Sequence, residues 1–374
     1  MGGSNSVNGS LLPFSQRPIV ILGAGIIGCA AARQLLRAGF SVVVVAEFLP
    51  GDQDINYASA WAGAAWHAAG GITPDQRYYQ VISHRVLLRM AQDPESGVHV
   101  VDGREYLEKE PAPNSAIWGR TVVSKVRRPE SSHLAGSPGL TQILQFRELN
   151  QGEYPANFHS AWAYDTLVTD PTRHMPWLGQ QITKLGGRFV RQRVNSLEEL
   201  YSMFPESTLF INASGIGSKT LTDVQDDNVY PERGQNVFLR TDACHTFYFR
   251  NGQEYTYVIP RPSSQGVVLG GVKQQGSLSP EVDPEIARDE LERAHRLAPD
   301  VVPEKPSAEN ISHIIGIRSS RKGGFRLDSE KQGHRTLLSA YGFGGGGYAF
   351  SYGVADAIQK LVERAEREHV IVEE

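Results

Sequence analysis

The stretch Val20-Ile21-Leu22-Gly23-Ala24-Gly25-Ile26-Ile27-Gly28-Cys29-Ala30-Ala31-Ala32 begins as an apolar run, breaks at Gly23 and continues as an alanine-rich helical pattern. Gly23, Gly25 and Gly28 have the spacing G-x-G-x-x-G. The first glycine permits a tight turn, the second lets the backbone approach a pyrophosphate, and the third lets the helix pack on the strand. We therefore expect a strand, a turn and a helix, with the backbone from Gly23 to Gly28, including Ala24, Ile26 and Ile27, against a dinucleotide.

A carboxylate follows the next predicted strand at the distance that such a site requires. The strand predicted at 41–46 is apolar after Ser41 and is followed by Glu47. An acidic residue about 20 positions after the glycine motif binds ribose hydroxyls. A carboxylate there would repel a 2′-phosphate. We therefore expect an ADP-type site for FAD or NAD, with a solvated strand-end carboxylate as the alternative for Glu47.

Composition limits the class of protein. A chain of 374 residues, 40% of them hydrophobic, predicts two structural domains with sizeable cores. The net charge of −4 does not favour nucleic acid. No apolar run approaches the ~20 residues of a membrane span, so no membrane partner is expected. Cys29 and Cys244 do not suggest a disulfide framework, which favours a reduced, intracellular protein, and no metal site is expected.

Small residues follow several strand signals. Residues 58–71 are low in charge and rich in alanine and glycine, which suits either close approach to a flat ring or a plain buried segment. A buried strand predicted at 208–213 ends at Ser214-Gly215. Another at 337–343 ends at Gly344-Gly345-Gly346-Gly347-Tyr348, before a helix predicted at 349–364. Such strand-to-helix junctions present N–H groups to a ligand.

The remaining segments predict a second sheet. A strand is expected at 161–168, followed by a helix at 171–185. Short runs of β-rich composition at 234–239, 246–250, 255–260 and 267–271 predict antiparallel pairing. Residues 1–17 are rich in Ser, Asn and Gly and lack a signal-peptide core, so a flexible leader is expected.

Several motifs then follow one another in a recognisable order. They include Tyr164-Asp165-Thr166, Asn212-Ala213-Ser214-Gly215, Arg233-Gly234-Gln235, Tyr257-Val258-Ile259-Pro260-Arg261-Pro262, Gly316-Ile317-Arg318 and Tyr341-Gly342-Phe343-Gly344. With the N-terminal glycine motif, they resemble the D-amino-acid oxidase and D-aspartate oxidase family of FAD flavoproteins. The resemblance extends from residue 18 to about residue 362, and the order and spacing of the motifs make it specific.

The resemblance implies an α/β fold in which a Rossmann-like FAD-binding domain is interleaved with an antiparallel-sheet substrate domain. The FAD domain would comprise residues 18–75, 161–230 and 306–370, and the substrate domain residues 76–160 and 231–305. FAD would be bound noncovalently. The flavin ring would contact Gly63 and Ala64 on one side and Gly344–Ala349 on the other, with Val194 at the adenine.

The resemblance also implies roles for single side chains. Arg318 would bind the carboxylate of a D-amino acid, since a guanidinium offers a bidentate fork, and Tyr257 would donate to the same carboxylate. Tyr348 would line the substrate site. The α-hydrogen would pass as hydride to the flavin, so no protein base is required. O₂ would reoxidise the flavin to give H₂O₂, with a 2-oxo acid and ammonia as the other products.

Substrate choice depends on two further cations. Arg250 and Lys273 fall where aspartate oxidases of the family carry arginines, which favours acidic substrates; the alternative is two solvated strand-edge charges. Ala349 replaces a frequently polar residue. A neutral-substrate oxidase therefore stays open, as does a flavin amine oxidase acting on glycine, a secondary amine or a biosynthetic intermediate, and a non-catalytic FAD- or NAD-binding protein.

The sequence leaves location and assembly open. The C-terminal residues Val372-Glu373-Glu374 lack an S-K-L-type address, so both a cytoplasmic and a peroxisomal location are expected alternatives. A homodimer is an open alternative to a monomer.

Overall fold

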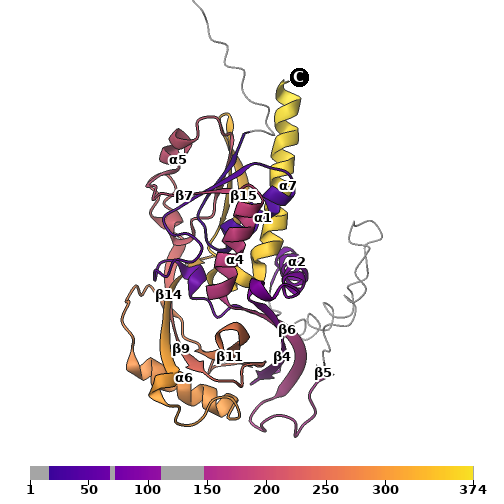
Figure 1. Cartoon of the computed structure of the whole chain (residues 1–374), viewed down its shortest axis with the longest axis vertical. Coiled ribbons are helices and arrows are strands. Elements are labelled where there is room, and N and C mark those ends of the chain that lie inside the picture. The colour runs from indigo at the N-terminus through magenta and orange to yellow at the C-terminus, as the bar shows by residue number, and fades with distance from the viewer. Residues whose placement is uncertain (1–16, 68–71, 111–146, 374) are drawn as a thin grey trace, which may run out of the picture.

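Two β-sheets organise the chain. The computed structural model describes residues 17–67, 72–110 and 147–373. The expected leader, apart from Arg17, and part of the expected substrate domain lie outside the described residues. Figure 1 shows the first sheet and most helices in one half of the molecule and the second sheet with α6 (Pro284–Leu297) in the other.

The first sheet has the parallel order that the glycine motif predicts. Five parallel strands lie in the order β16-β8-β1-β2-β7, and β15 adds an antiparallel edge. Its strands are β1 (Ile19–Leu22), β2 (Val42–Ala46), β7 (Arg188–Arg191), β8 (Leu209–Asn212), β15 (Arg326–Gln332) and β16 (Arg335–Tyr341). Strand β15, whose outward side chains are polar and charged, was not predicted.

Helices cover both faces of this sheet. Ile19 and Ile21 of β1 pack on one face with α1 (Ile26–Arg37), α2 (Pro74–Met90), α4 (Pro171–Lys184) and α7 (Gly347–Glu373). Val20 and Leu22 pack on the other face with α5 (Leu197–Met203). Because successive strand side chains point to opposite faces, a strand covered on both sides is apolar at every position. The uninterrupted apolar run in β1 has this cause, and the expected α/β fold is confirmed.

The second sheet is larger and mixed. Its strands lie in the order β13-β9-β12-β11-β10-β4-β6-β3, with β14 paired to β9 and β5 paired to β6. Their bounds are β3 (Ala65–Trp66), β4 (Val98–Leu107), β5 (Arg147–Glu148), β6 (Ser160–Thr169), β9 (Val229–Arg240), β10 (Thr246–Asn251), β11 (Thr256–Arg261), β12 (Gly266–Gly270), β13 (Gln274–Gln275) and β14 (Ile311–Arg321). The β-rich runs at 234–239, 246–250, 255–260 and 267–271 pair antiparallel, as expected. Strands β4 and β10 pair in parallel, an arrangement open to strands that are far apart in the chain and are not joined by a hairpin.

Three strands of the second sheet fall inside the segments predicted for the FAD domain. They are β3, β6 and β14. β14 continues toward the glycine turn at the end of β16, where Ser320 forms an isolated bridge with Phe343. The exact domain boundaries therefore stay a prediction. None of the helices in the described part of the chain is long and apolar enough to cross a membrane.

Candidate active site

The turn between β1 and α1 has the geometry that the glycine motif predicts. Gly23 has a φ of +106°. A Cβ on Gly28 would lie 1.9 Å from the carbonyl oxygen of Gly23, so only glycine fits there. α1 follows Gly25 without a side-chain cap, and the Ile26 N–H donates to Ser59 Oγ at 2.9 Å. The positive end of the α1 dipole therefore faces the space beyond β1.

A first hollow of about 540 Å³ lies at the carboxyl ends of β1, β2 and β8. Glu47 lies on its rim, where its carboxylate is 3.4 Å from the Arg193 guanidinium. Gly28 is not in the wall, because it packs against Gly23 as the third glycine of the motif. The wall contains many residues predicted for the cofactor, namely Gly23, Ala24, Gly25, Ile26, Ile27, Glu47, Val194, Ser214, Gly215, Gly344 and Gly347.

A second hollow of about 540 Å³ adjoins the first. The two walls share six residues, which are Ile26, Ala58, Ser59, Phe343, Gly344 and Gly347. The second hollow lies between the glycine turn after β16 and one face of the second sheet. It brings together the other predicted residues, Gly63, Ala64, Gly345, Gly346, Tyr348, Ala349, Tyr257, Lys273 and Arg318.

Arg318 reaches the second hollow from β14, opposite Glu232 of β9. Its Nη1 donates to Glu232 Oε1 at 3.0 Å, and its Nη2 donates to the Val272 carbonyl at 3.4 Å. A Cβ on Gly234 would lie 2.3 Å from Nη2, so this glycine creates the space for the guanidinium. Arg318 is thus held from one side and remains 20% exposed, as a site for a ligand carboxylate requires.

Tyr257 is fixed by a buried neighbour. Its O–H donates to Asn236 Oδ1 at 2.6 Å. Burial raises the pKa of Tyr257, and the smaller opposing effect comes from Arg318, so the phenol stays protonated. A phenol has one O–H to donate. Donation to a substrate carboxylate therefore requires the O–H to turn away from Asn236.

The histidine in the wall of the second hollow is neutral. Burial, with a smaller contribution from the charge of Lys273, lowers the pKa of His67 to about 4. The His67 ring packs against Phe249, with ring centroids 4.9 Å apart. These contacts give His67 a packing role beside the hollow at neutral pH.

The structure separates the two cations predicted for an acidic side chain. Lys273 lines the second hollow, with Nζ 4.7 Å from the ring centroid of Tyr255. Arg250 is absent from the described wall, and its Nε and Nη1 donate to Glu108 and Glu254, both at 2.6 Å. The parallel pairing of β10 with β4 places Glu108 beside Arg250. The expectation that Arg250 faces the substrate is therefore not met in this conformation.

Sequence reasoning missed several wall residues, among them Asn236, Tyr255 and Ser59. Asn236 follows the quoted Arg233-Gly234-Gln235 motif, and its polar side chain on a buried strand is a signal that could have found it. Tyr255 lies directly before β11 and two positions before Tyr257, so both side chains lie on the same face of the strand. Ser59, the polar residue of a small-residue segment, binds the start of α1.

The two hollows together fit a cofactor with a nucleotide at one end and a flat ring at the other. Glycine amides and a helix dipole line the first hollow, and backbone-rich segments at Gly63 and Gly344–Gly347 line the second. A Cβ on Gly63 would lie 2.6 Å from Ile259 Cδ1, so the wall is already close-packed behind this backbone. Bare backbone allows a flat ring to approach closely.

The chain matches the family described as FAD dependent oxidoreductase over residues 18–361. It therefore belongs to this family of FAD-dependent oxidoreductases, and FAD is its cofactor. It is 29% identical over 347 residues to a D-amino-acid oxidase from Schizosaccharomyces pombe, covering 91% of this chain and 94% of that protein. It is 30% identical over 376 residues to a D-aspartate oxidase from Talaromyces thermophilus, covering 93% and 96%. A glycine oxidase structure from Geobacillus kaustophilus has the same fold, with a TM-score of 0.68, 17% identity and coverage of 93% and 95%.

Proposed function

We propose that the chain is an FAD-dependent D-amino-acid oxidase. The main support is that Arg318, Tyr257 and the glycine turn at Gly344–Gly347 line one hollow that adjoins the dinucleotide hollow. The similarity to a D-amino-acid oxidase and a D-aspartate oxidase over more than nine-tenths of the chain points the same way.

The side chains would bind and orient the substrate. Arg318 would hold its carboxylate through the guanidinium edge that Glu232 does not use. Tyr257 would stay protonated and supply a hydrogen bond after leaving Asn236. Bound FAD would supply the acceptor for the two electrons and the α-hydrogen. Catalysis by these residues then consists mainly of fixing the Cα–H direction.

In this proposal, D-amino acids with an acidic side chain are the preferred substrates. Lys273 has no carboxylate partner among the described residues, and no Asp or Glu is found in the described wall of the second hollow. Neutral D-amino acids are the second candidate, because Phe247, Phe249 and Tyr255 form an apolar part of the same wall. Lysine is a point charge, so its selectivity should be weaker than that of two arginines.

The decisive experiment measures H₂O₂ formation by the FAD-loaded protein with D-Asp, D-Glu, D-Ala, D-Val, glycine and sarcosine. Higher kcat/KM for D-Asp than for D-Ala supports the acidic form of the proposal. A preference for D-Ala selects the neutral form, and turnover of glycine or sarcosine alone contradicts both.

A further inference from the structure

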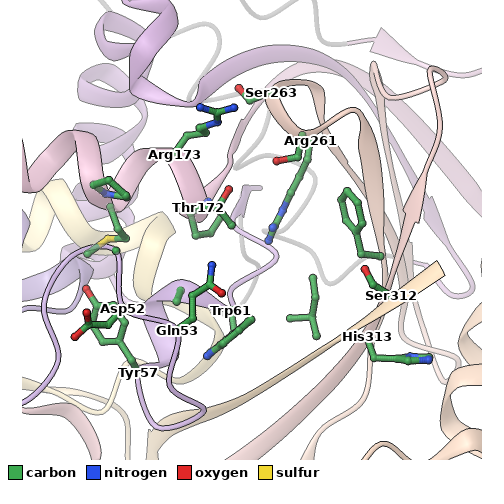
Figure 2. Close-up of a pocket in the computed structure, with 18 of the residues that line it drawn as sticks. Asp52, Gln53, Tyr57, Trp61, Thr172, Arg173, Arg261, Ser263, Ser312 and His313 are labelled. Atoms are coloured by element: carbon green, nitrogen blue, oxygen red, sulfur yellow. The ribbon is translucent and has the colours of Figure 1, made fainter. Parts of the chain in front are cut away.

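A third space opens outside the two hollows. This groove of about 660 Å³ lies between the first turn of α4, the loop 51–61, the turn after β11 and nearby parts of β9 and β14. We call it the α4 groove (Figure 2). Trp61 is shared with the second hollow and Tyr57 with the first. These two aromatic side chains therefore stand between the groove and the predicted cofactor and substrate sites.

The wall of the α4 groove is rich in cations. It contains Arg173, Arg240 and Arg261. Within the described residues, Arg173 and Arg240 have no ion-pair partner. The carboxylate in the described wall is Asp52, which already accepts from both terminal nitrogens of Arg191 at 2.5 and 3.1 Å. Asp52 therefore does little to offset the groove's positive charge.

Arg261 is the buried cation at the base of the groove. It is only 3% exposed, and its Nη2 donates to the Ala62 carbonyl at 2.6 Å. Its Nε is buried without a hydrogen-bond partner among the described residues. Figure 2 shows its side chain extending from β11 into the groove, toward the space between Thr172 and Trp61. A buried N–H without a partner is costly, and an anion is the strongest partner for it.

The nearest carboxylate, that of Asp170, does not accept a hydrogen bond from Arg261. Asp170 Oδ1 lies 3.8 Å from Arg261 Nη1, which is beyond hydrogen-bond distance. Asp170 instead accepts from the Thr172 N–H at 3.1 Å, from the Thr172 hydroxyl at 2.7 Å, and from Ser264 Oγ. Its charge offsets one of the three arginines, so the groove keeps a net positive charge.

Apolar surfaces lie beside the cations. Trp61, Met175, Phe238 and Ile314 all contribute to the wall. Trp61 is held in place because its Nε1 donates to the Asp54 carbonyl at 2.6 Å. A ligand with both a charged group and a flat apolar part would match this combination, since apolar walls with a few placed polar groups are typical of small-molecule sites.

The geometry points to the α4 groove as a binding site for a small organic anion, separate from the substrate site. A phosphate or carboxylate group would lie between Arg261 and Arg173 or Arg240, and a flat apolar part would lie on Trp61. The Arg261 contact with the Ala62 carbonyl links the site to the second hollow, because Ala62 and the adjacent Gly63 both line that hollow.

Calorimetry on the FAD-loaded full chain tests binding without turnover, so its outcome is independent of the proposed oxidase activity. The probes are phenyl phosphate, isophthalate and inorganic phosphate. We expect at least one aromatic anion to bind more tightly than inorganic phosphate, and the better of the two identifies the charged group. Failure of both aromatic anions to bind at millimolar concentration overturns the proposal.

Variants locate the ligand. Arg173→Met and Arg240→Met should each raise the Kd of the better probe at least fivefold, whereas Arg188→Met, an exposed arginine on β7, should leave it unchanged. Unchanged Kd in both groove variants overturns the proposal. So does a ligand lost in Lys273→Met but kept in Arg173→Met, because that ligand lies in the second hollow.

The link to the second hollow has its own readout. A ligand at Arg261 should perturb the visible absorption band of bound FAD, with the same concentration dependence as the calorimetric signal. A probe that binds by calorimetry and leaves the flavin spectrum unchanged contradicts the link through Ala62.

Discussion

Arg318 Nη1 lies 3.0 Å from Glu232 Oε1, on strands β14 and β9 that pair at these two positions. The partner side chains are 20% and 13% exposed. The pair therefore sits at the edge of the second hollow, where screening by water is incomplete. Glu232 holds the guanidinium in place and also repels a ligand carboxylate that approaches it.

Glu232→Gln should lower the KM for D-amino acids while leaving kcat nearly unchanged. The amide oxygen can still accept from Nη1, but the repulsion of the substrate carboxylate is removed. We expect an effect on the order of 1 kcal/mol, which is about fivefold in KM. Steady-state peroxide assays measure it.

Glu232→Ala is the matched control. It removes the same charge together with the hydrogen bond, so the guanidinium loses its fixed direction and kcat should fall. Identical kinetics for the Gln and Ala variants and the wild type would contradict a role of Arg318 in substrate binding.

Gly28→Ala should lower the thermal stability of the FAD-free protein and weaken FAD binding at least tenfold. A Cβ there would lie 1.9 Å from the Gly23 carbonyl oxygen, so the turn must shift. Gly347→Ala is the control for the thermal melts of the FAD-free protein, because its Cβ would lie 3.7 Å from Ile26 Cγ2, an ordinary contact. Thermal melts of the FAD-free forms and flavin fluorescence titrations measure both effects. Equal melting temperatures for Gly28→Ala and wild type would refute the steric argument.

Local signals explain what the sequence predicts well. The turn at Gly23, the strand end at Glu47 and the glycine run after β16 are each decided by neighbours in the chain, and all of them reach the hollows. Arg250 could not be placed in the same way. Its partner Glu108 is 142 positions away and reaches it through the parallel pairing of β4 with β10. The α4 groove likewise has walls from separate segments of the chain, which no single motif reveals.

Glu290→Gln should stabilise the protein increasingly as the pH rises. Burial raises the pKa of Glu290 to about 9 from an ordinary value of 4.5, and both side-chain oxygens lack hydrogen-bond partners in the described structure. The folded state thus holds a proton that the unfolded state releases. The free energy of unfolding of the wild type should therefore fall as pH rises from about 4.5 to 9, by about 1.4 kcal/mol per pH unit at most.

The glutamine variant lacks this titration, so its advantage over the wild type should be larger at pH 8 than at pH 6. Urea unfolding of the FAD-loaded protein at both pH values measures the difference. Glu292→Gln, an exposed position on the same helix, should show no such trend. A constant difference between Glu290→Gln and wild type across this range would refute a buried, protonated Glu290.

Lys273→Met should lower kcat/KM for D-Asp without a matching loss for D-Ala. Lys273 lines the second hollow with no carboxylate partner among the described residues, so its charge is available to a substrate side chain. A difference of about 1.4 kcal/mol corresponds to tenfold in the ratio of the two kcat/KM values. Steady-state assays on both substrates measure that ratio.

Arg250→Met separates this role from a purely structural one. Arg250 is bound by Glu108 and Glu254 and is absent from the described wall. Among the described residues, its removal leaves Glu108 without a cation and leaves Glu254 with Arg296 alone, at 3.5 Å. We expect a lower melting temperature and an unchanged D-Asp to D-Ala ratio. Arg250→Met and Lys273→Met each remove one positive charge. A difference between the two variants therefore reports where the charge lies and not the loss of charge itself. A selective loss on D-Asp in Arg250→Met, with none in Lys273→Met, would place the substrate carboxylate at Arg250 and require the ion pairs with Glu108 and Glu254 to open during binding.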